Sequence, residues 1–240
     1  MATCNNGTCD LQHNLYNMNP IDRILAVFAP ESCVNCMQEG AVLCFECRDT
    51  IETLPSICYA CGRATRTGKP CEKCITRSSP AHVWVYTAYN GTAKDVISAY
   101  KFDEKRSAAL PIAQCLDSSL PYFASDPLVT FVPTATSHSR QRGFDHAGLM
   151  ARELSRLRNW HYARLLHRNS QVRQIGSTRQ QRKKQLQGAF SVVNKRLVEN
   201  RHILLVDDVI TTGSTIEECA KVLLLAGAKQ VDVVVFARTP

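Results

Sequence analysis

Eight of the twelve cysteines gather in one short segment, and this clustering limits what the segment can fold into. They form four Cys-x-x-Cys pairs: Cys33/Cys36, Cys44/Cys47, Cys58/Cys61 and Cys71/Cys74. Each pair presents two thiolates from one tight turn, which is half of a tetrahedral zinc site. A segment of this size cannot build a sufficient apolar core without metal. We therefore predict a zinc-binding double ribbon over residues 31–77, with two structural Cys4 zinc sites.

Two other uses of these cysteines, and the pairing of the four turns, stay open. A disulfide framework is the first alternative, but no export signal is visible, so a reducing cytoplasm and zinc are favoured. One zinc beside a degenerate second site is the other. The turns can pair sequentially or in a cross-braced order. Loops of seven and nine residues inside the two sequential units close at little entropic cost, which favours sequential pairing.

The net charge of +8 is unevenly distributed along the chain. No acidic residue lies between Glu153 and Glu199, whereas eleven lysines and arginines do. A basic run of this kind indicates an anionic partner, either the phosphates of a small molecule or a nucleic acid. A solvated basic surface is the alternative interpretation.

The whole chain has the composition of a folded protein, with 240 residues of which 45% are hydrophobic. No apolar run is long enough to span a membrane. Residues 1–30 read as a weakly structured leader, and residues 81–240 as the second domain. Apolar runs predict strands over 82–89, 129–132, 203–206 and 231–237, and helical patterns cover 92–101, 106–120, 144–158 and 215–225. The alternation predicts an α/β fold with a mainly parallel sheet flanked by helices.

The most specific stretch runs from His202 to Thr215, with the sequence H-I-L-L-V-D-D-V-I-T-T-G-S-T. An apolar strand leads into Asp207 and Asp208, and a hydroxyl-rich turn with one glycine then begins a helix. Ligands of open α/β sheets bind at the carboxyl ends of strands, and backbone N–H groups at a helix N-terminus bind anions. Carboxylates accept hydrogen bonds from vicinal diols and help to hold Mg²⁺. The combination suits a sugar phosphate.

This stretch resembles the phosphoribosyl pyrophosphate (PRPP) motif of type I phosphoribosyltransferases. The resemblance implies a type I phosphoribosyltransferase fold that binds PRPP with Mg²⁺. The two acids would contact the ribose hydroxyls and the turn would hold the 5′-phosphate. The implied PRPP-binding residues are Asp207, Asp208, Thr211, Thr212, Gly213, Ser214 and Thr215. Purine-salvage relatives often carry an acid at the position of Thr211, so the threonine disfavours simple purine salvage.

The order of the motifs resembles the ComF family, also called GntX-like proteins, which join a double zinc ribbon to a phosphoribosyltransferase domain. The order is the cysteine segment, Tyr100-Lys101-Phe102, Val132-Pro133, Arg142-Gly143-Phe144 and the PRPP motif. The resemblance implies diphosphate binding by Pro133, Thr134, Arg140 and Arg142. It also implies a hood over the site, or a DNA contact, formed by the basic residues Arg173, Arg179, Arg182, Lys183 and Lys184. The family usually has Asn-Gln where Asp145 and His146 stand here.

The family resemblance connects the chain with natural competence, the uptake of DNA and its integration as single strands. We expect a cytoplasmic protein that binds Mg-PRPP and supports natural transformation. Single-stranded DNA and DNA-uptake or DNA-processing proteins are the expected further partners. One alternative is an active phosphoribosyltransferase of nucleotide metabolism with an unknown acceptor. The other is a non-catalytic PRPP-sensing or DNA-binding protein on this fold.

Overall fold

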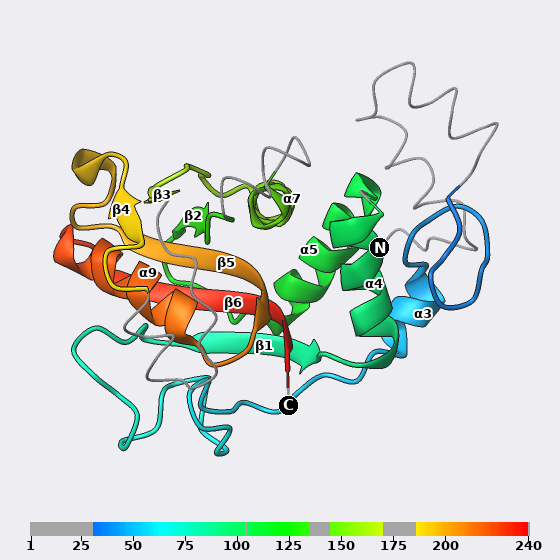
Figure 1. The fold of residues 1–240 in the computed structure, drawn as a ribbon, viewed down its shortest axis with the longest axis horizontal. Helices are drawn as coiled ribbons and strands as arrows, with labels where there is room; N and C mark the ends of the chain where they lie inside the picture. Colours follow the sequence, from blue (N-terminus) through cyan, green and yellow to red (C-terminus); the bar gives the residue numbers. More distant parts are fainter. Residues whose placement is uncertain (1–30, 104, 135–144, 170–185, 240) are drawn as a thin grey trace.

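A four-stranded parallel sheet forms the centre of the computed structural model, which describes residues 31–103, 105–134, 145–169 and 186–239 (Figure 1). Its strands are β1 (Val83–Ala88), β2 (Leu128–Phe131), β5 (His202–Ile210) and β6 (Gln230–Arg238), in the spatial order β1-β6-β5-β2. Their apolar runs are buried on both faces, as parallel strands between helical layers require. The predicted α/β fold with a parallel sheet is confirmed.

Helices cover both faces of the sheet (Figure 1). One face packs against α4 (Gly91–Phe102), α5 (Ala109–Ser119) and α7 (His146–Arg158), and the other against α9 (Ser214–Leu225). Side chains alternate along each strand, so Leu204 and Val206 of β5 lie in the first apolar cluster and Ile203 and Leu205 in the second. The four predicted helices are confirmed, and the region 106–120 begins with the 3₁₀ turn η1 (Arg106–Ala108).

Two short strands were not predicted. β3 (Leu166–Arg168) and β4 (Phe190–Val192) pair antiparallel, with Arg168 opposite Phe190. Three residues are too few to show a periodic pattern, which explains why the sequence does not reveal them. The pair brings together the two ends of the chain segment that contains residues 170–185. Two further short turns are α3 (Phe45–Asp49) and η2 (Lys195–Leu197).

A buried carboxylate fastens the amino ends of three strands. Asp232 of β6 is 1% exposed; its Oδ1 lies 2.9 Å from His82 Nδ1, and its Oδ2 lies 2.7 Å from His202 Nε2. Gln230 donates a further hydrogen bond of 2.8 Å to Oδ2. Burial opposes ionisation, but these hydrogen bonds outweigh it, so the pKa of Asp232 lies below its ordinary value. The network holds β1, β5 and β6 in register at the edge opposite Asp207.

Residues 1–30, the predicted weakly structured leader, lie outside the described part of the chain. Within the described ranges, no helix is both long and apolar enough to cross a membrane.

Candidate functional site at the carboxyl edge of the sheet

Strand β5 carries the paired acids past the end of its neighbour β2. The ladder between β2 and β5 ends at the Phe131–Val206 pair, whereas the ladder between β5 and β6 continues to Ile210–Arg238. Asp207 and Asp208 therefore lie within β5, not after it as the sequence suggested, because pairing with β6 extends the strand by four residues beyond Val206. The ladder between β2 and β5 has ended before Asp207, so β5 is not paired with β2 where the two acids lie. Both aspartates are intermediate in exposure there, neither fully buried nor fully exposed as residues.

The two carboxylates have different surroundings because neighbouring residues of a strand point to opposite faces. Asp208 Oδ2 lies 2.8 Å from the ammonium of Lys101, in the last turn of α4. Asp207 Oδ1 accepts a hydrogen bond of 2.9 Å from the backbone N–H of Asp208. Burial raises the pKa of Asp207 well above its ordinary value, the charge of Asp208 raises it further, and Lys101 opposes both. The site therefore holds a carboxyl group whose ionisation the ligand-free fold disfavours.

Replacing Asp207 with asparagine is expected to raise the melting temperature at pH 7. A carboxyl with a raised pKa in the folded state stabilises the fold below the unfolded pKa of about 3.9, and this stabilisation is lost as the pH rises through the folded pKa. Asparagine does not ionise, so the variant does not lose stability as the pH rises. Its side-chain oxygen can still accept the hydrogen bond from Asp208 N–H. Thermal unfolding from pH 3 to pH 8 measures the effect, with exposed Asp95→Asn on α4 as the control. An Asp207→Asn variant that is less stable than the wild type at pH 7 contradicts the assignment.

The loop after β5 has the form of an anion-binding turn. Gly213 has φ +78° and immediately precedes α9, whose first N–H groups lack acceptors within the helix. Next to it, the hydroxyls of Thr212 and Ser214 lie 3.0 Å apart, and Ser214 N–H donates to Thr212 Oγ1 at 3.4 Å. Backbone donors, hydroxyls and the positive end of the helix dipole thus meet in residues 211–215, which we call the PRPP loop after the motif that this stretch resembles.

Asp145 joins the two ends of the predicted diphosphate-binding segment. Its carboxylate accepts from Thr134 N–H at 2.9 Å and from Thr134 Oγ1–H at 3.1 Å, and it caps α7 through Gly148 N–H at 3.4 Å. Pro133 and Thr134 are therefore fixed where this segment begins. Arg140 and Arg142, the predicted arginines, lie outside the described residues. The acid that departs from the family pattern thus has a structural task as helix cap and loop anchor.

Lys101 and His146 belong to sequence motifs noted above, but neither was predicted as a site residue. His146 is 2% exposed; its Nε2 lies 2.8 Å from the carbonyl oxygen of Tyr100, and Tyr100 Oη–H donates to the His146 carbonyl at 2.7 Å. This reciprocal pair fastens the last turn of α4, with Lys101, to the first turn of α7. The Tyr-Lys-Phe motif was the sequence feature that could have pointed to these residues. Only the fold shows that its lysine faces Asp208.

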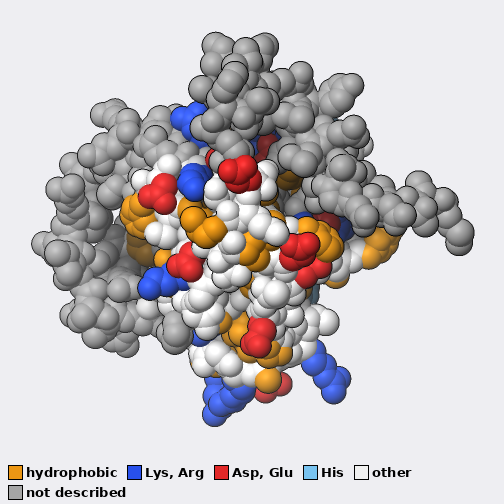
Figure 2. Space-filling model, turned by 90° about the vertical axis from the view of Figure 1, so that its right-hand side faces the viewer, with side chains coloured by type: hydrophobic (Ala, Val, Ile, Leu, Met, Phe, Trp, Pro, Cys, Tyr) orange, Lys and Arg blue, Asp and Glu red, His pale blue; other side chains and the backbone are white. Residues whose placement is uncertain are grey.

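Three cations of the basic run form ion pairs in the described part of the chain, and five others lie outside it. Arg156 pairs with Glu153 at 3.1 Å, Arg158 pairs with Asp117, and Lys195 Nζ lies 3.5 Å from Glu199 Oε1. Figure 2 shows one face of the molecule, on which coloured acidic and basic side chains are interspersed. The predicted hood or DNA-contact residues all lie outside the described ranges: Arg173, Arg179, Arg182, Lys183 and Lys184.

The eight cysteines of the four pairs form two groups that could each hold a structural zinc ion. Cys33, Cys36, Cys44 and Cys47 make one group, and Cys58, Cys61, Cys71 and Cys74 the other, with all sulfurs of a group within 4.8 Å of one another. The pairing is sequential, so the cross-braced alternative is wrong. The Cys36–Cys44 and Cys61–Cys71 sulfurs are 3.7 Å apart. A zinc tetrahedron with bonds of about 2.3 Å has edges of about 3.8 Å, so the donor sets fit zinc.

Each cysteine group contains one thiol with a lowered pKa. Burial alone would raise the pKa of Cys33, but backbone N–H donors, among them those of Cys36 and Cys44, outweigh it and set the pKa at about 6. The same balance sets the pKa of Cys58 at about 6. All ten described cysteines are free thiols, including buried Cys115 and Cys219, which are core residues as expected. Thiolates are the form that binds zinc.

The two cysteine groups pack on opposite faces of the sheet. Cys33 and Cys47 of the first belong to the apolar cluster of α4, α5 and α7. Tyr59 of the second belongs to the cluster that contains α9. In Figure 1 the first group lies beside α3 and α4, whereas the second lies in the loops below β1 and α9. Only the second group therefore reaches the side of the sheet that carries the PRPP loop.

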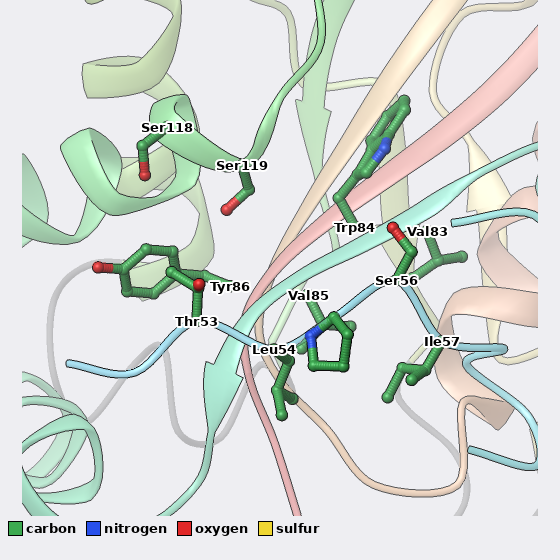
Figure 3. Close-up of a pocket in the computed structure, with 11 residues that line it drawn as sticks. Thr53, Leu54, Ser56, Ile57, Val83, Trp84, Val85, Tyr86, Ser118 and Ser119 are labelled. Atoms are coloured by element: carbon green, nitrogen blue, oxygen red, sulfur yellow. The ribbon is translucent and has the colours of Figure 1, made fainter. Parts of the chain in front are cut away.

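A pocket of about 200 Å³ lies along the free edge of β1, between the linker that joins the cysteine groups and the end of α5 (Figure 3). Residues 53–57, 83–86 and 118–119 line it, and none of them is charged. The linker follows β1 closely, and Leu54 N–H donates to the Tyr86 carbonyl at 2.8 Å. The pocket is two strands away from β5 and offers no charge to a phosphate, so we do not assign it to the site.

Comparisons with known proteins find a matching domain family and several relatives. A model of the family described as "Phosphoribosyl transferase domain" matches residues 141–240. The chain is 29% identical over 208 residues to "DNA utilization protein YhgH" of Escherichia coli (strain K12), covering 82% of this chain and 90% of that one. It is 27% identical over 227 residues to "Competence protein F" of Haemophilus influenzae, covering 86% and 96%. It is 26% identical over 203 residues to "Competence protein ComFC" of Bacillus subtilis, covering 77% and 79%.

Among solved structures, the chain is similar to the glutamine PRPP amidotransferase from B. subtilis in complex with ADP and GMP. The identity is 23% and the TM-score 0.40, over 54% of this chain and 26% of that one. A second similar structure, described as the allosteric regulatory enzyme of purine biosynthesis, has an identity of 22% and a TM-score of 0.38, over 54% and 25%.

Proposed function

We propose that this chain, which matches a phosphoribosyl transferase domain and is similar to proteins named for competence, is a ComF-like protein that binds PRPP with Mg²⁺ and supports natural transformation in the cytoplasm. One observation carries the proposal. Asp207 and Asp208 lie at the open end of β5, and the PRPP loop follows directly at the N-terminus of α9. A diol-binding acid pair beside a phosphate-binding turn matches the two ends of a ribose 5-phosphate.

We assign the ligand contacts from this geometry. The carboxylates of Asp207 and Asp208 accept hydrogen bonds from the two ribose hydroxyls. Backbone N–H groups and hydroxyls of the PRPP loop donate to the 5′-phosphate. The diphosphate lies toward Thr134, where the segment with Arg140 and Arg142 begins, and arginine suits bidentate contact with phosphate oxygens. Mg²⁺, when bound with PRPP, neutralises part of the diphosphate charge.

Lys101 completes the electrostatics of the proposed site. Its ammonium lies 2.8 Å from Asp208 Oδ2, so it partly neutralises the acid pair before any ligand arrives. The pair is mostly shielded from solvent, with 25% of the lysine side chain and 15% of the aspartate side chain exposed. Lys101 holds the Asp208 carboxylate in place and leaves Asp207 as the acid with the raised pKa.

PRPP binding is tested by calorimetric titration of the zinc-loaded protein with Mg-PRPP, Mg-diphosphate and ribose 5-phosphate. We expect Mg-PRPP to bind more tightly than either fragment, because one site holds both ends of the ligand. Equal weak binding of all three would show a surface that attracts anions in general. Release of diphosphate in a screen of nitrogen nucleophiles would favour the alternative of an active transferase, in which the acceptor attacks ribose C1 and diphosphate leaves with the electron pair.

Contact with single-stranded DNA is the second part of the proposal. The relatives named for DNA utilization and competence support it, and so does the positive charge that the sequence concentrates in residues 173–184, where no acidic residue lies. Basic segments bind single strands chiefly through the phosphate backbone, so affinity must fall steeply with salt. A non-catalytic PRPP-sensing protein without DNA contact is the alternative, and it predicts no such dependence.

Reversing Arg182, Lys183 and Lys184 to glutamate is expected to abolish measurable binding of single-stranded DNA. If low salt restores measurable binding, the slope of log K against log salt should be lower by about 2, since each phosphate contact on a single strand contributes about 0.7. The matched control reverses three cations of the described part: Arg156, Lys195 and Arg196. Fluorescence anisotropy at several salt concentrations measures both variants. If the first variant binds like the wild type, the DNA site lies elsewhere.

A further inference from the structure

Tyr59 reaches from the second cysteine group into the packing around the PRPP loop. It lies between Cys58 and Cys61, and its side chain is fully buried. It belongs to the same apolar cluster as Ile210, before the loop, and Ile216, after it. Its hydroxyl donates a hydrogen bond of 3.0 Å to Glu217 Oε1 on α9. A side chain of the zinc-binding turn is thus part of the core under the loop.

The tyrosine ring lies directly against Gly213. A Cβ atom at Gly213 would come within 2.7 Å of Tyr59 Cδ2 and 3.0 Å of Tyr59 Cε2, closer than such contacts occur. Glycine is therefore required at this position for two reasons: its φ is +78°, and the Tyr59 ring leaves no space for a side chain. The ring leaves room for a hydrogen atom only and so restricts where the loop backbone can go.

The turn that carries Tyr59 is fastened to the end of β6. Arg238 Nη1 donates to the Tyr59 carbonyl at 2.8 Å and to the Cys58 carbonyl at 3.3 Å. The next residue of the chain, Thr239, donates its N–H to the carbonyl of Ile210 at 3.0 Å. The Cys58–Cys61 turn and the residue before the PRPP loop are therefore tied to two adjacent residues at the end of β6, Arg238 and Thr239. A metal ion that fixes this turn also fixes the ring under Gly213.

We propose that Tyr59 is a positioning residue for the PRPP loop, so that the second Cys4 group sets the loop conformation used in ligand binding. This inference rests on the proposed function of the loop. Donors held in place before binding lose less freedom when the ligand arrives, which raises affinity. The first group lacks this connection among the described residues: its matching residue, Val34, packs on the opposite face of the sheet.

The first test compares Mg-PRPP affinity in zinc-loaded variants whose metal content is verified. Tyr59→Leu, which removes the ring, should weaken binding at least about tenfold, and Tyr59→Phe, which removes only the hydroxyl, about threefold. Val34→Ala is the matched control in the first group and should bind like the wild type. Wild-type affinity in a Tyr59→Leu variant that retains both zinc ions overturns the inference.

A second test uses the wild-type protein, since Tyr59→Leu can fail to fold. Coupling between two binding sites is reciprocal. If zinc in the second group favours the loop conformation that binds Mg-PRPP, bound Mg-PRPP must strengthen zinc binding by the second group. We expect saturating Mg-PRPP to slow zinc transfer to a chelator from the second group at least about threefold and to leave the first unchanged. Cys36→Ser, which weakens the first group alone, assigns the two phases. Equal rates with and without Mg-PRPP contradict the proposal.

A third measurement separates failure of this inference from failure of the proposed function. If the wild type binds no Mg-PRPP, the proposed function is wrong, and the positioning role is judged on the ligand-free protein. Amide hydrogen exchange at Gly213, Ser214 and Thr215 should then be at least about tenfold faster in Tyr59→Phe or Tyr59→Leu than in the wild type. Unchanged exchange in both variants overturns the positioning role.

Discussion

Replacing Asp207 and Asp208 together with alanine is expected to weaken Mg-PRPP binding about 1,000-fold. Each carboxylate is assigned one charge-assisted hydrogen bond to a ribose hydroxyl, worth about 2 kcal/mol, and a total of about 4 kcal/mol corresponds to that factor. Loss of the Lys101–Asp208 ion pair destabilises the fold, and removal of the Asp207 carboxyl offsets this, because burial and the neighbouring charge disfavour its ionisation. We therefore expect stability within about 1 kcal/mol of the wild type. Calorimetry and thermal unfolding measure the two effects.

The control for this pair is Asp95→Ala, an exposed acid on α4 that should leave PRPP affinity unchanged. In cells, the double alanine variant should lose the transformation function while its protein level stays normal. A double variant that binds Mg-PRPP as tightly as the wild type would show that the acids are not the ribose contacts. One that loses binding but still supports transformation would separate the pocket from the DNA role.

Replacing Gly213 with alanine is expected to be the most damaging single substitution in the PRPP loop. The new Cβ would meet the Tyr59 ring at 2.7 Å and would hold a left-handed backbone at φ +78°. The strain of that conformation and the overpacking together cost about 3–4 kcal/mol if the loop keeps its shape. Because the loop can move away instead, part of this cost will appear as lost affinity. We expect a lower melting temperature and PRPP binding weaker by at least about 100-fold.

The double variant Gly213→Ala with Tyr59→Leu tests the cause of that damage. Without the ring, the added methyl group has space, so the two substitutions should cost less together than the sum of their separate effects. Gly188→Ala is the matched control for backbone strain, since it has φ +73° but open space around the added Cβ. Additive costs in the double variant would show that Tyr59 does not press on the loop.

The parts of the fold that could be predicted from sequence are those with local patterns. Apolar runs revealed the four sheet strands, and the spacing of apolar residues revealed α7 and α9. Sequential pairing of the Cys-x-x-Cys turns was favoured but left open by the sequence, because short loops close at little entropic cost, and the structure shows it. The end of β5 was misjudged at Asp207, since pairing with β6 across the sheet, not the local sequence, decides where that strand stops.

The contacts that complete the candidate site could not be read from the sequence because they join distant segments. Lys101 meets Asp208 only after α4 packs beside β5. Asp145 and Thr134 hold the ends of one loop through side-chain geometry that no periodic pattern encodes. Tyr59 gave no signal as a loop contact, since a tyrosine between zinc ligands has no characteristic spacing to Gly213. Each of these contacts depends on the tertiary fold.

The most direct test of the central claim maps where PRPP binds. Amide resonances of the ¹⁵N-labelled, zinc-loaded protein should be recorded with increasing Mg-PRPP, and with Mg-diphosphate as the reference. Binding as proposed shifts the amides of Asp207, Asp208 and residues 211–215 with Mg-PRPP, and diphosphate alone leaves the PRPP loop largely unmoved. If the PRPP loop amides stay unchanged at saturating Mg-PRPP, or if the shifts gather elsewhere, the site at the end of β5 is wrong.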